Sequence, residues 1–470
     1  MLKNGYLTKI TLVAALGGLL FGYDTAVISG TVGSLKSFFV DPLGYDELQA
    51  NSLLGFVVSS ALIGCIIGSI MGGYFSAHFG RRKSLMLAAL LFLISALGSA
   101  MPEMGFATIG EGNHTHLKQF IFYRIMGGIG VGLASMLSPM YISEVAPSKR
   151  RGSLVSWNQF AIIFGMLVVY FVNYGISNQG SEDWLRMVGW RWMFASEVIP
   201  ASLFFMLLFV VPRSPRWLVL KGKVEEARAI LNKINPKENT QNIIESIVGG
   251  ITRHTSGSLF SYGYLVIFIG ILLSVFQQFV GINVVLYYAP EIFKNAGAST
   301  NTSLLQTIIV GAINLTFTVI AIKTVDRFGR KPLQIVGAIG MGISMLALGT
   351  TFSTNTMGLL SLISILVYVA AFAISWGPVT WVLLSEMFPN KIRGKAMALA
   401  VAVQWVSNFI VSQTFPMMNE NSWLTEKFNH GFAYWLYGII GFIAAWFVWK
   451  WVPETKGKSL EQMEELWIKE

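Results

Sequence analysis

Stretches of about 20 apolar residues recur along the whole of this 470-residue chain. Because a hydrocarbon core about 30 Å thick takes about 20 residues of α-helix, each stretch predicts one membrane crossing. Only 12% of the residues are charged, against about 25% in a soluble domain. The sequence therefore predicts an all-α membrane protein with twelve transmembrane helices. They are expected at residues 8–31, 50–76, 84–101, 118–141, 153–177, 190–211, 260–290, 303–323, 332–352, 358–384, 395–416 and 432–452.

Basic residues gather in alternate loops of this arrangement. Clusters of Lys and Arg lie at residues 81–83, 149–151, 323–331 and 391–395, and the loops between them are acidic or nearly neutral. The positive-inside rule then places both termini and the central link in the cytoplasm, which predicts a multi-pass protein of the inner (plasma) membrane. The formal net charge of +10 reports this orientation, so no nucleic-acid partner is expected.

The longest polar stretch divides the chain into two groups of six crossings. Within it, KVEEARAILNKI (residues 223–234) has apolar residues at helical spacing and predicts an amphipathic cytoplasmic helix. We therefore expect four parts, which are an N-terminal six-helix bundle, a cytoplasmic helical linker, a C-terminal six-helix bundle and a cytoplasmic tail. Their expected bounds are residues 1–213, 214–258, 259–452 and 453–470.

Two motifs of the first group return in the second group in the same order. HFGRRKSL (residues 78–85) has a counterpart in RFGRKPL (residues 327–333), and YISEVAPSKRRG (residues 141–152) has one in LLSEMFPNKIRG (residues 383–394). Such repeats predict two similarly oriented bundles. Parallel repeats of this kind place a substrate site near the midplane between the bundles and open it to each side in turn.

Further motifs identify a family. They are GGLLFGYDTAVISG (17–30), GRR (80–82), DRFGRK (326–331), SEVAPSKRRG (143–152), SEMFPNKIRG (385–394), PRSPRWL (212–218), QQFVGINVVLYYAP (277–290) and PETKG (453–457). In this order, over essentially the whole chain, they resemble the sugar porters of the major facilitator superfamily, most closely the bacterial D-xylose:proton symporters. The resemblance implies the major facilitator fold and proton-coupled import of a monosaccharide, with D-xylose as the first choice. Glucose or another hexose is the alternative substrate, carried with a proton or passively.

Amide side chains cluster in the seventh apolar stretch, where Gln277, Gln278 and Asn283 lie within seven residues. A sugar hydroxyl must exchange water for a protein partner, and amides inside an apolar helix supply such partners. Asn283 and Tyr287 are four residues apart and share one helix face. Gly281 between the amides favours a discontinuous helix, which is where transporter sites form. The alternative is that these amides only join helices together.

The family resemblance extends the predicted sugar site to further positions. In full, the expected set is Phe21, Gln159, Gln277, Gln278, Asn283, Tyr287, Asn314, Trp381, Gln404 and Trp405. Met166 departs from the pattern, because the xylose symporters are expected to have a second glutamine at this place and many hexose carriers an apolar residue.

Charged residues at the cytoplasmic ends form a second expected group. The resemblance implies that acids and arginines pair across the two bundles when the carrier faces outward and separate when it opens inward. This latch is expected to comprise Arg81, Glu144, Arg151, Asp326, Arg330, Glu386 and Arg393. Ala77 stands where the first motif usually has an acid, and Arg213 stands where PESPR would have Glu, so the first half is expected to latch more weakly.

One acid lies inside the first apolar stretch. An ionised Asp at a helix centre costs roughly 2.5 to 3.5 kcal/mol, so Asp24 predicts a function. Arg124 is the intramembrane cation of the fourth stretch, and glycines after it allow helices to approach closely. Burial raises the proton affinity of a carboxylate and a nearby Arg lowers it. Asp24 and Arg124 therefore predict proton coupling, with a permanent structural ion pair as the alternative.

Two other classes of membrane protein fit the sequence less well. A channel needs a continuous polar pore, but here polar residues cluster at mid-depth and at the inner rim. An enzyme needs a catalytic set of His, Cys or paired acids in the bilayer, and none is present in the sequence. We therefore expect a carrier rather than an enzyme, with a monosaccharide, the proton and the lipid bilayer as partners. We expect a monomer without cofactor or metal.

Overall fold

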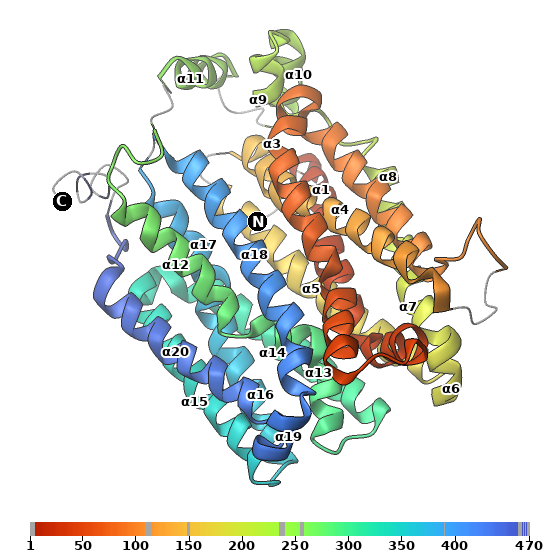
Figure 1. The fold of residues 1–470 in the computed structure, drawn as a ribbon. Coiled ribbons are helices and arrows are strands. Elements are labelled where there is room, and N and C mark those ends of the chain that lie inside the picture. Colours follow the sequence, from red (N-terminus) through yellow and green to blue (C-terminus); the bar gives the residue numbers. More distant parts are fainter. Residues whose placement is uncertain are drawn as a thin grey trace.

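In the computed structural model, all regular secondary structure of the described part of the chain is helical. The described residues are 5–108, 114–147, 151–234, 240–253, 258–389, 391–458, 463, 465 and 467. Long helices from the first half (red to yellow in Figure 1) lie beside long helices from the second half (green to blue). This arrangement confirms the predicted fold of twelve membrane crossings in two bundles.

The helices of the first half begin near the amino terminus and end before the linker. They are α1 (Gly5–Val27), η1 (Ile28–Gly30), α2 (Val32–Leu35), η2 (Lys36–Val40), η3 (Asp41–Leu43), α3 (Glu47–Ala100), η4 (His114–His116), α4 (Leu117–Val145), α5 (Arg151–Ser177), α6 (Glu182–Trp184), η6 (Leu185–Gly189), α7 (Trp190–Ala195) and α8 (Val198–Leu207).

Among the described residues, the linker contributes three helices and the second half nine. The linker helices are α9 (Pro215–Leu220), α10 (Val224–Ile234) and α11 (Thr240–Arg253). Those of the second half are α12 (Leu265–Phe279), α13 (Ile282–Asn295), α14 (Thr300–Phe328), α15 (Arg330–Ser353), α16 (Leu359–Ile374), α17 (Trp376–Met387), α18 (Arg393–Asn419), α19 (Ser422–Phe428) and α20 (Phe432–Trp451).

Ten helical segments of the described chain are long and apolar enough to cross a membrane. One of them, α3, holds two predicted crossings in 54 residues, with a break at Gly80, where φ is +79° and ψ is 162°. The predicted crossing at 190–211 is interrupted between α7 and α8, at Ser196 and Glu197. Counting α3 twice and adding this interrupted stretch gives the twelve predicted crossings.

The predicted amphipathic helix of the linker corresponds to α10. Ala227, Leu231 and Ile234 are buried on one face of α10, and Leu218 of α9 and Ile244 of α11 pack in the same small apolar cluster as Ala227 and Leu231. The apolar spacing of residues 223–234 predicted α10, whereas α11 was not predicted. These linker helices lie at one end of the bundle (upper part of Figure 1).

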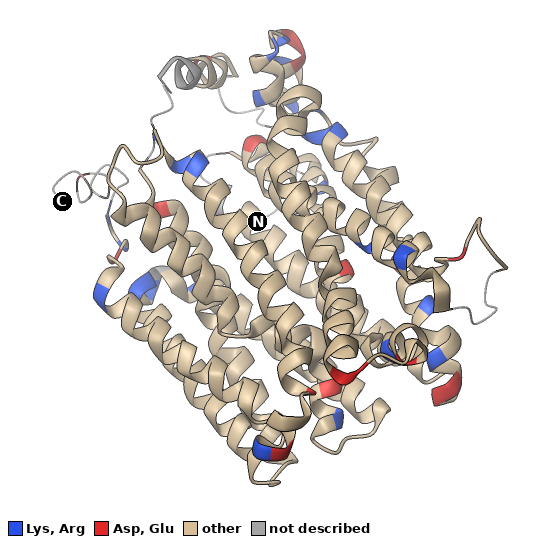
Figure 2. Cartoon of the chain, viewed as in Figure 1, with Lys and Arg blue, Asp and Glu red and all other residues tan. Residues whose placement is uncertain are grey.

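Charged side chains mark the two ends of the molecule. Figure 2 shows Lys and Arg at the end that carries α9 and α10, Asp and Glu at the opposite end near α6 and α19, and few charges between. The linker end is therefore the cytoplasmic side under the positive-inside rule.

Hydrogen bonds join the two halves at the outer ends of their helices. The Gln413 amide of α18 donates to the Ser52 carbonyl of α3 at 2.8 Å and accepts from the Ser59 hydroxyl at 3.1 Å. The Ser177 hydroxyl of α5 donates to the Asn301 side chain of α14 at 3.3 Å. The outer side of the carrier is thus closed by direct contacts between the halves.

Candidate functional site

Asp24 and Arg124 meet in the interior of the first bundle. Arg124 Nη1 donates to Asp24 Oδ1 at 3.0 Å, and Arg124 Nη2 lies 3.4 Å from the Asp24 carbonyl oxygen. The exposed fractions of the two residues are 0% and 1%. The Arg124 guanidinium also lies 5.3 Å from the centre of the Phe194 ring. The pair is therefore removed from water on all sides.

Glycine makes room for this pair, as the sequence suggested. A Cβ atom at Gly127, one turn after Arg124, would lie 3.1 Å from Asp24 Oδ1 and 2.3 Å from the Ser95 hydroxyl. A Cβ at Gly128 would lie 1.8 Å from the Ala61 carbonyl oxygen of α3. The segment after Arg124 thus packs so closely against its neighbours that only glycine fits.

A second buried acid, Glu197, was not anticipated from the sequence. It stands between α7 and α8 and its exposed fraction is 0%. The hydroxyl of its neighbour Ser196 lies 2.7 Å from the hydroxyl of Tyr23, the residue before Asp24, so Glu197 is close enough for its charge to interact with those of Asp24 and Arg124. Within the described chain, neither Glu197 oxygen nor Asp24 Oδ2 receives a hydrogen bond. The sequence did offer one signal for a functional acid here, because Glu197 is the single acid inside the predicted crossing at 190–211. The site therefore contains two carboxyls and one guanidinium.

The seventh predicted crossing breaks at Gly281, as expected. There φ is +91°, a left-handed value that favours glycine, and α12 ends and α13 begins on either side. Asn283 Nδ2 donates to Gln278 Oε1 at 2.6 Å across the break. Gln278 Nε2 lies 3.4 Å from Gln277 Oε1. The three amides thus form one connected chain around the break.

Gln277 links this chain to two other helices. Its Nε2 donates to the Trp376 carbonyl at the start of α17, at 2.9 Å, and its Oε1 accepts from Gln404 of α18. The Trp376 carbonyl lies beside a second break, at Ser375, where φ is −128° and ψ is −89°. Gln277 therefore connects the two discontinuous crossings of the second half.

The other expected sugar ligands lie on several helices. Tyr287 of α13 is buried and its hydroxyl accepts from Asn408 Nδ2 at 3.3 Å. Phe21 of α1 and Trp405 of α18 face each other across the halves with ring centres 5.6 Å apart. Asn314 is buried, whereas Gln159 is partly exposed and Trp381 is exposed. No hydrogen bond connects these last three to the amide chain in the described structure.

A bidentate ion pair closes the cytoplasmic end of the first bundle. Arg81 Nε and Nη2 both donate to Glu144 Oε1, at 3.1 Å and 2.7 Å. The Ser214 hydroxyl donates to the other oxygen of Glu144 at 2.5 Å. Ser214 belongs to the PRSPRWL motif at the start of the linker, so three separate segments meet here.

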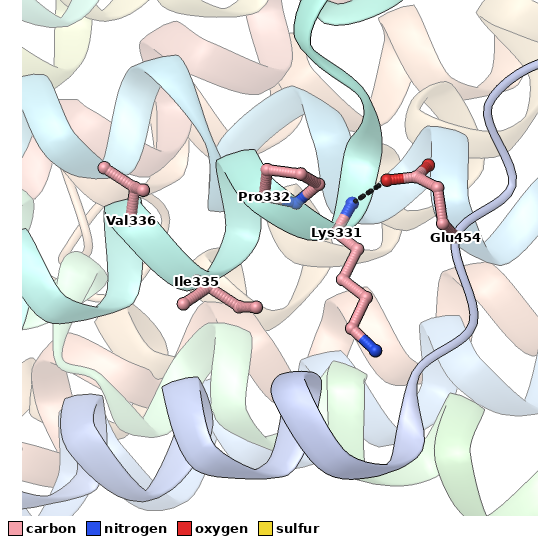
Figure 3. Close-up of a pocket in the computed structure, with 5 residues that line it drawn as sticks. All are labelled: Lys331, Pro332, Ile335, Val336 and Glu454. Carbon is pink, nitrogen blue, oxygen red and sulfur yellow. Dashed lines mark hydrogen bonds between the residues drawn. The ribbon is translucent and has the colours of Figure 1, made fainter.

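The second bundle repeats this arrangement. Arg330 Nε and Nη2 donate to the two oxygens of Glu386 at 3.0 Å and 2.8 Å, and the Thr455 hydroxyl donates to Glu386 at 2.6 Å. Glu454, beside Thr455, accepts from the backbone N–H group of Arg330 at 3.1 Å and from that of Lys331 at 3.0 Å. Figure 3 shows the bond from Lys331. Glu454 therefore caps the amino end of α15.

The two halves differ at the position of this cap. Arg213 stands where the second half has Glu454, and it lies 3.7 Å from Glu226 of the linker. Burial raises the pKa of the Glu454 carboxyl, but the bonds it receives from the backbone N–H groups of Arg330, Lys331 and Lys456 outweigh burial and lower that pKa overall. The N–H groups therefore favour the ionised carboxylate of Glu454 at the amino end of α15. The first half has the cation Arg213 at the matching position.

The remaining latch residues have different surroundings. Arg393 Nε donates to the Phe388 carbonyl at 3.1 Å. The side chains of Arg151 and Asp326 lie outside the described part of the structure. Both bidentate pairs join residues of the same bundle, so the pairing across bundles remains a prediction for the outward-facing conformation.

The fold and these two sites define a class of protein. Two six-crossing bundles enclose a chain of amides, a buried acid–base group lies in the first bundle, and matching ion pairs lie at the inner ends. Within the described residues, no group of three His, Cys, Asp or Glu side chains could hold a metal ion. This arrangement is that of a secondary membrane carrier with alternating access.

The chain belongs to the sugar (and other) transporter family, whose model matches residues 10–467. It is 62% identical to the D-xylose-proton symporter of Escherichia coli strain K12, over 99% of this chain and 96% of that protein. It is 43% identical to the glucose facilitated diffusion protein of Zymomonas mobilis, over 99% of this chain and 98% of that protein.

Solved structures of the E. coli xylose transporter share the fold. The inward-open conformation has a TM-score of 0.89 and 60% identity, covering 98% of this chain and 100% of that one. The complex with 6-bromo-6-deoxy-D-glucose has a TM-score of 0.83 and 62% identity, covering 98% and 99%. The predicted family and fold are thereby confirmed, and the protein is a transporter rather than an enzyme.

Proposed function

We propose that this protein imports D-xylose together with a proton across the inner membrane by alternating access. The observation that carries the proposal is the buried group of Asp24, Arg124 and Glu197, supported by 62% identity to a D-xylose-proton symporter. With both carboxyls ionised, this group has a net charge of −1. An uncompensated charge in the interior costs several kcal/mol, and one bound proton removes it.

The proton site can change its affinity when the bundles move. Asp24 Oδ2 and both Glu197 oxygens lack hydrogen-bond donors in the described structure, so each carboxyl has an oxygen that can take up a proton. When the site meets water on one side, hydration favours the doubly ionised form and releases the proton. When it is closed, burial favours the protonated form. This alternation supplies the coupling that a symporter needs.

The amide chain at the Gly281 break supports a sugar as the cargo. Gln277, Gln278 and Asn283 offer both donors and acceptors, and the Phe21 and Trp405 rings offer flat apolar surfaces between the halves. These are the groups that bind the hydroxyls and the C–H face of a monosaccharide. We assign the sugar ligands to these residues together with Gln159, Tyr287, Asn314, Trp381 and Gln404.

A hexose is the second candidate substrate. Met166 of α5, buried at 7% exposure, stands where a xylose carrier is expected to have a glutamine. The relatives include a passive glucose carrier as well as D-xylose and arabinose symporters, with the last 41% identical over 99% of this chain. Identity to the D-xylose symporter is higher, so D-xylose is the first choice.

Uptake into proteoliposomes tests both parts of the proposal. The purified protein is reconstituted, and radiolabelled D-xylose and D-glucose are supplied with and without an inward proton gradient. We expect D-xylose to accumulate above equilibrium only when the gradient is present. Accumulation that ignores the gradient would contradict symport, and uptake of D-glucose with D-xylose inert would contradict the pentose assignment.

A further inference from the structure

Two tyrosines of the second bundle contact the break between α12 and α13. The Tyr368 hydroxyl of α16 donates to the Val280 carbonyl oxygen at 2.8 Å. The Tyr437 ring of α20 covers Gly281, where an added Cβ atom would lie 2.8 Å from the ring. Both tyrosines are buried, with exposed fractions of 1% and 3%. Neither belongs to the sugar site described above.

The Val280 carbonyl is one of the backbone groups that lose their helical partner at the break. Helix α12 ends at Phe279, and the hydrogen bonds that open α13 begin with the Gly281 carbonyl, which accepts from the Val285 N–H at 3.2 Å. In the interior of a membrane protein, a backbone carbonyl that has lost its helical partner needs another donor. The Tyr368 hydroxyl supplies that donor from a neighbouring helix.

The amides of the sugar site lie immediately on either side of this carbonyl. Gln278 precedes Val280 by two residues and Asn283 follows it by three, and the two side chains are joined at 2.6 Å. The direction in which α13 leaves α12 therefore sets the spacing of these two amides. A group that fixes Val280 fixes that direction.

We propose that Tyr368 is a positioning residue of the sugar site. Its hydroxyl holds the Val280 carbonyl, and this bond keeps Gln278 and Asn283 at the spacing that a monosaccharide requires. The inference rests on the proposed sugar-binding role of these amides. Tyr368 does not touch the sugar itself, because its hydroxyl is committed to the backbone behind the break.

The test replaces single hydroxyl groups in the second bundle. Tyr368→Phe removes the bond to Val280. Two control variants remove other tyrosine hydroxyls. Tyr437→Phe keeps the ring over Gly281, and Tyr434→Phe changes a tyrosine that is 0% exposed. In the described structure the hydroxyls of Tyr434 and Tyr437 have no hydrogen-bond partner. The two control variants thus match Tyr368→Phe in chemistry and burial but leave the Val280 bond intact.

Binding of D-xylose and D-glucose to each purified variant is measured by calorimetry, and thermal unfolding is measured alongside. We expect Tyr368→Phe to raise the Kd of the bound sugar about threefold to tenfold, the range of one net hydrogen bond, and both controls to keep the wild-type Kd. KM in sugar exchange should rise in parallel, with the maximal rate changing less.

The outcomes separate this inference from the proposed function. If the wild-type chain binds neither sugar, the proposed function is wrong and the inference falls with it. If the wild-type chain binds sugar and Tyr368→Phe binds it as tightly as the two controls do, only the inference is overturned. A Tyr368→Phe variant that lowers the unfolding temperature without changing Kd or KM also overturns it, because the role would then be structural.

Discussion

Asp24 and Glu197 are the two buried acids to which the proposed function assigns proton coupling. Both acids are 0% exposed, and Arg124 is the cation of their group. In the described structure, Arg124 donates a hydrogen bond to the carboxyl of Asp24 but not to that of Glu197. A buried ion pair of this kind stabilises a fold poorly, because desolvation offsets the attraction between the charges. Its retention in the interior is better explained by a function that needs a proton site.

Replacing Asp24 by Asn tests this role. Asp24→Asn keeps the size of the side chain but removes the exchangeable proton, so we expect loss of gradient-driven accumulation while sugar binding and sugar exchange persist. Uptake and exchange in proteoliposomes measure the two effects separately. Asp183→Asn is the matched control, because Asp183 is exposed in α6. Loss of both accumulation and exchange in Asp24→Asn would indicate a structural ion pair instead.

The residue at position 166 offers a test of sugar preference. Met166→Gln restores an amide where the xylose pattern expects one, so we expect D-xylose to bind about threefold to tenfold more tightly, the range of one added hydrogen bond. D-Glucose serves as the internal comparison in the same titrations. An unchanged ratio of the two Kd values would mean that position 166 does not contact the sugar.

Among the helices, the sequence predicted long apolar elements well and their interruptions unevenly. The break at Gly281 was foreseen because a glycine stands between amides, and its φ of +91° agrees. The break at Ser196 and Glu197 was not foreseen, although Pro200 has no N–H to donate to the Ser196 carbonyl and was a signal for it. The pairing of Glu144 with Arg81 inside one bundle also escaped prediction. Partners 63 residues apart are set by packing rather than by local pattern.

The cap of α15 predicts a pH-dependent contribution to stability. Because the pKa of Glu454 is lowered in the folded protein, its carboxylate stabilises fully above the usual glutamate pKa of about 4.3 and loses its effect as pH falls through the lowered value. Glu454→Gln should therefore lower the stability near neutral pH, by about 0.3 kcal/mol given the exposure of this group.

Thermal unfolding near pH 7 and near pH 4 measures the effect of Glu454→Gln. The difference from the wild type should shrink at the lower pH. Arg213→Gln is the control, because Arg213 occupies the matching position of the first half and caps no helix in the described structure. A difference that grows toward low pH would contradict the role of the carboxylate as a cap.

At the scale of the whole molecule, the outer closure depends on very close contact between the halves. A Cβ atom at Gly55 of α3 would lie 2.3 Å from the Gln413 carbonyl oxygen of α18. Backbone atoms cannot give way there as a flexible side chain does. A large residue at position 55 is therefore incompatible with the closed outer side.

Gly55→Trp should hold the carrier open to the outside. We expect transport to fall by more than about tenfold, since a conformational shift of a few kcal/mol depopulates the closed state, while sugar still binds from outside. Ser177 lies where the halves meet, so Ser177→Cys in a Cys65→Ala background places a single thiol there. Reaction of this thiol with a membrane-impermeant maleimide reports opening of the outer side. Gly73→Trp is the control, because Gly73 in the same helix faces open space. Equal labelling of the two variants would contradict the prediction.

The separation of the two sites has an evolutionary consequence. Asp24, Arg124 and Glu197 all belong to the first bundle, whereas the connected amides Gln277, Gln278, Asn283 and Gln404 all belong to the second. Under the proposed function, the groups assigned to proton coupling lie in one bundle and the connected amides in the other. Changes in the first bundle can then alter the dependence on protons while these amides keep their contacts with the sugar. Active and passive carriers can then arise within one lineage, in keeping with 43% identity between this chain and a facilitated-diffusion carrier of glucose.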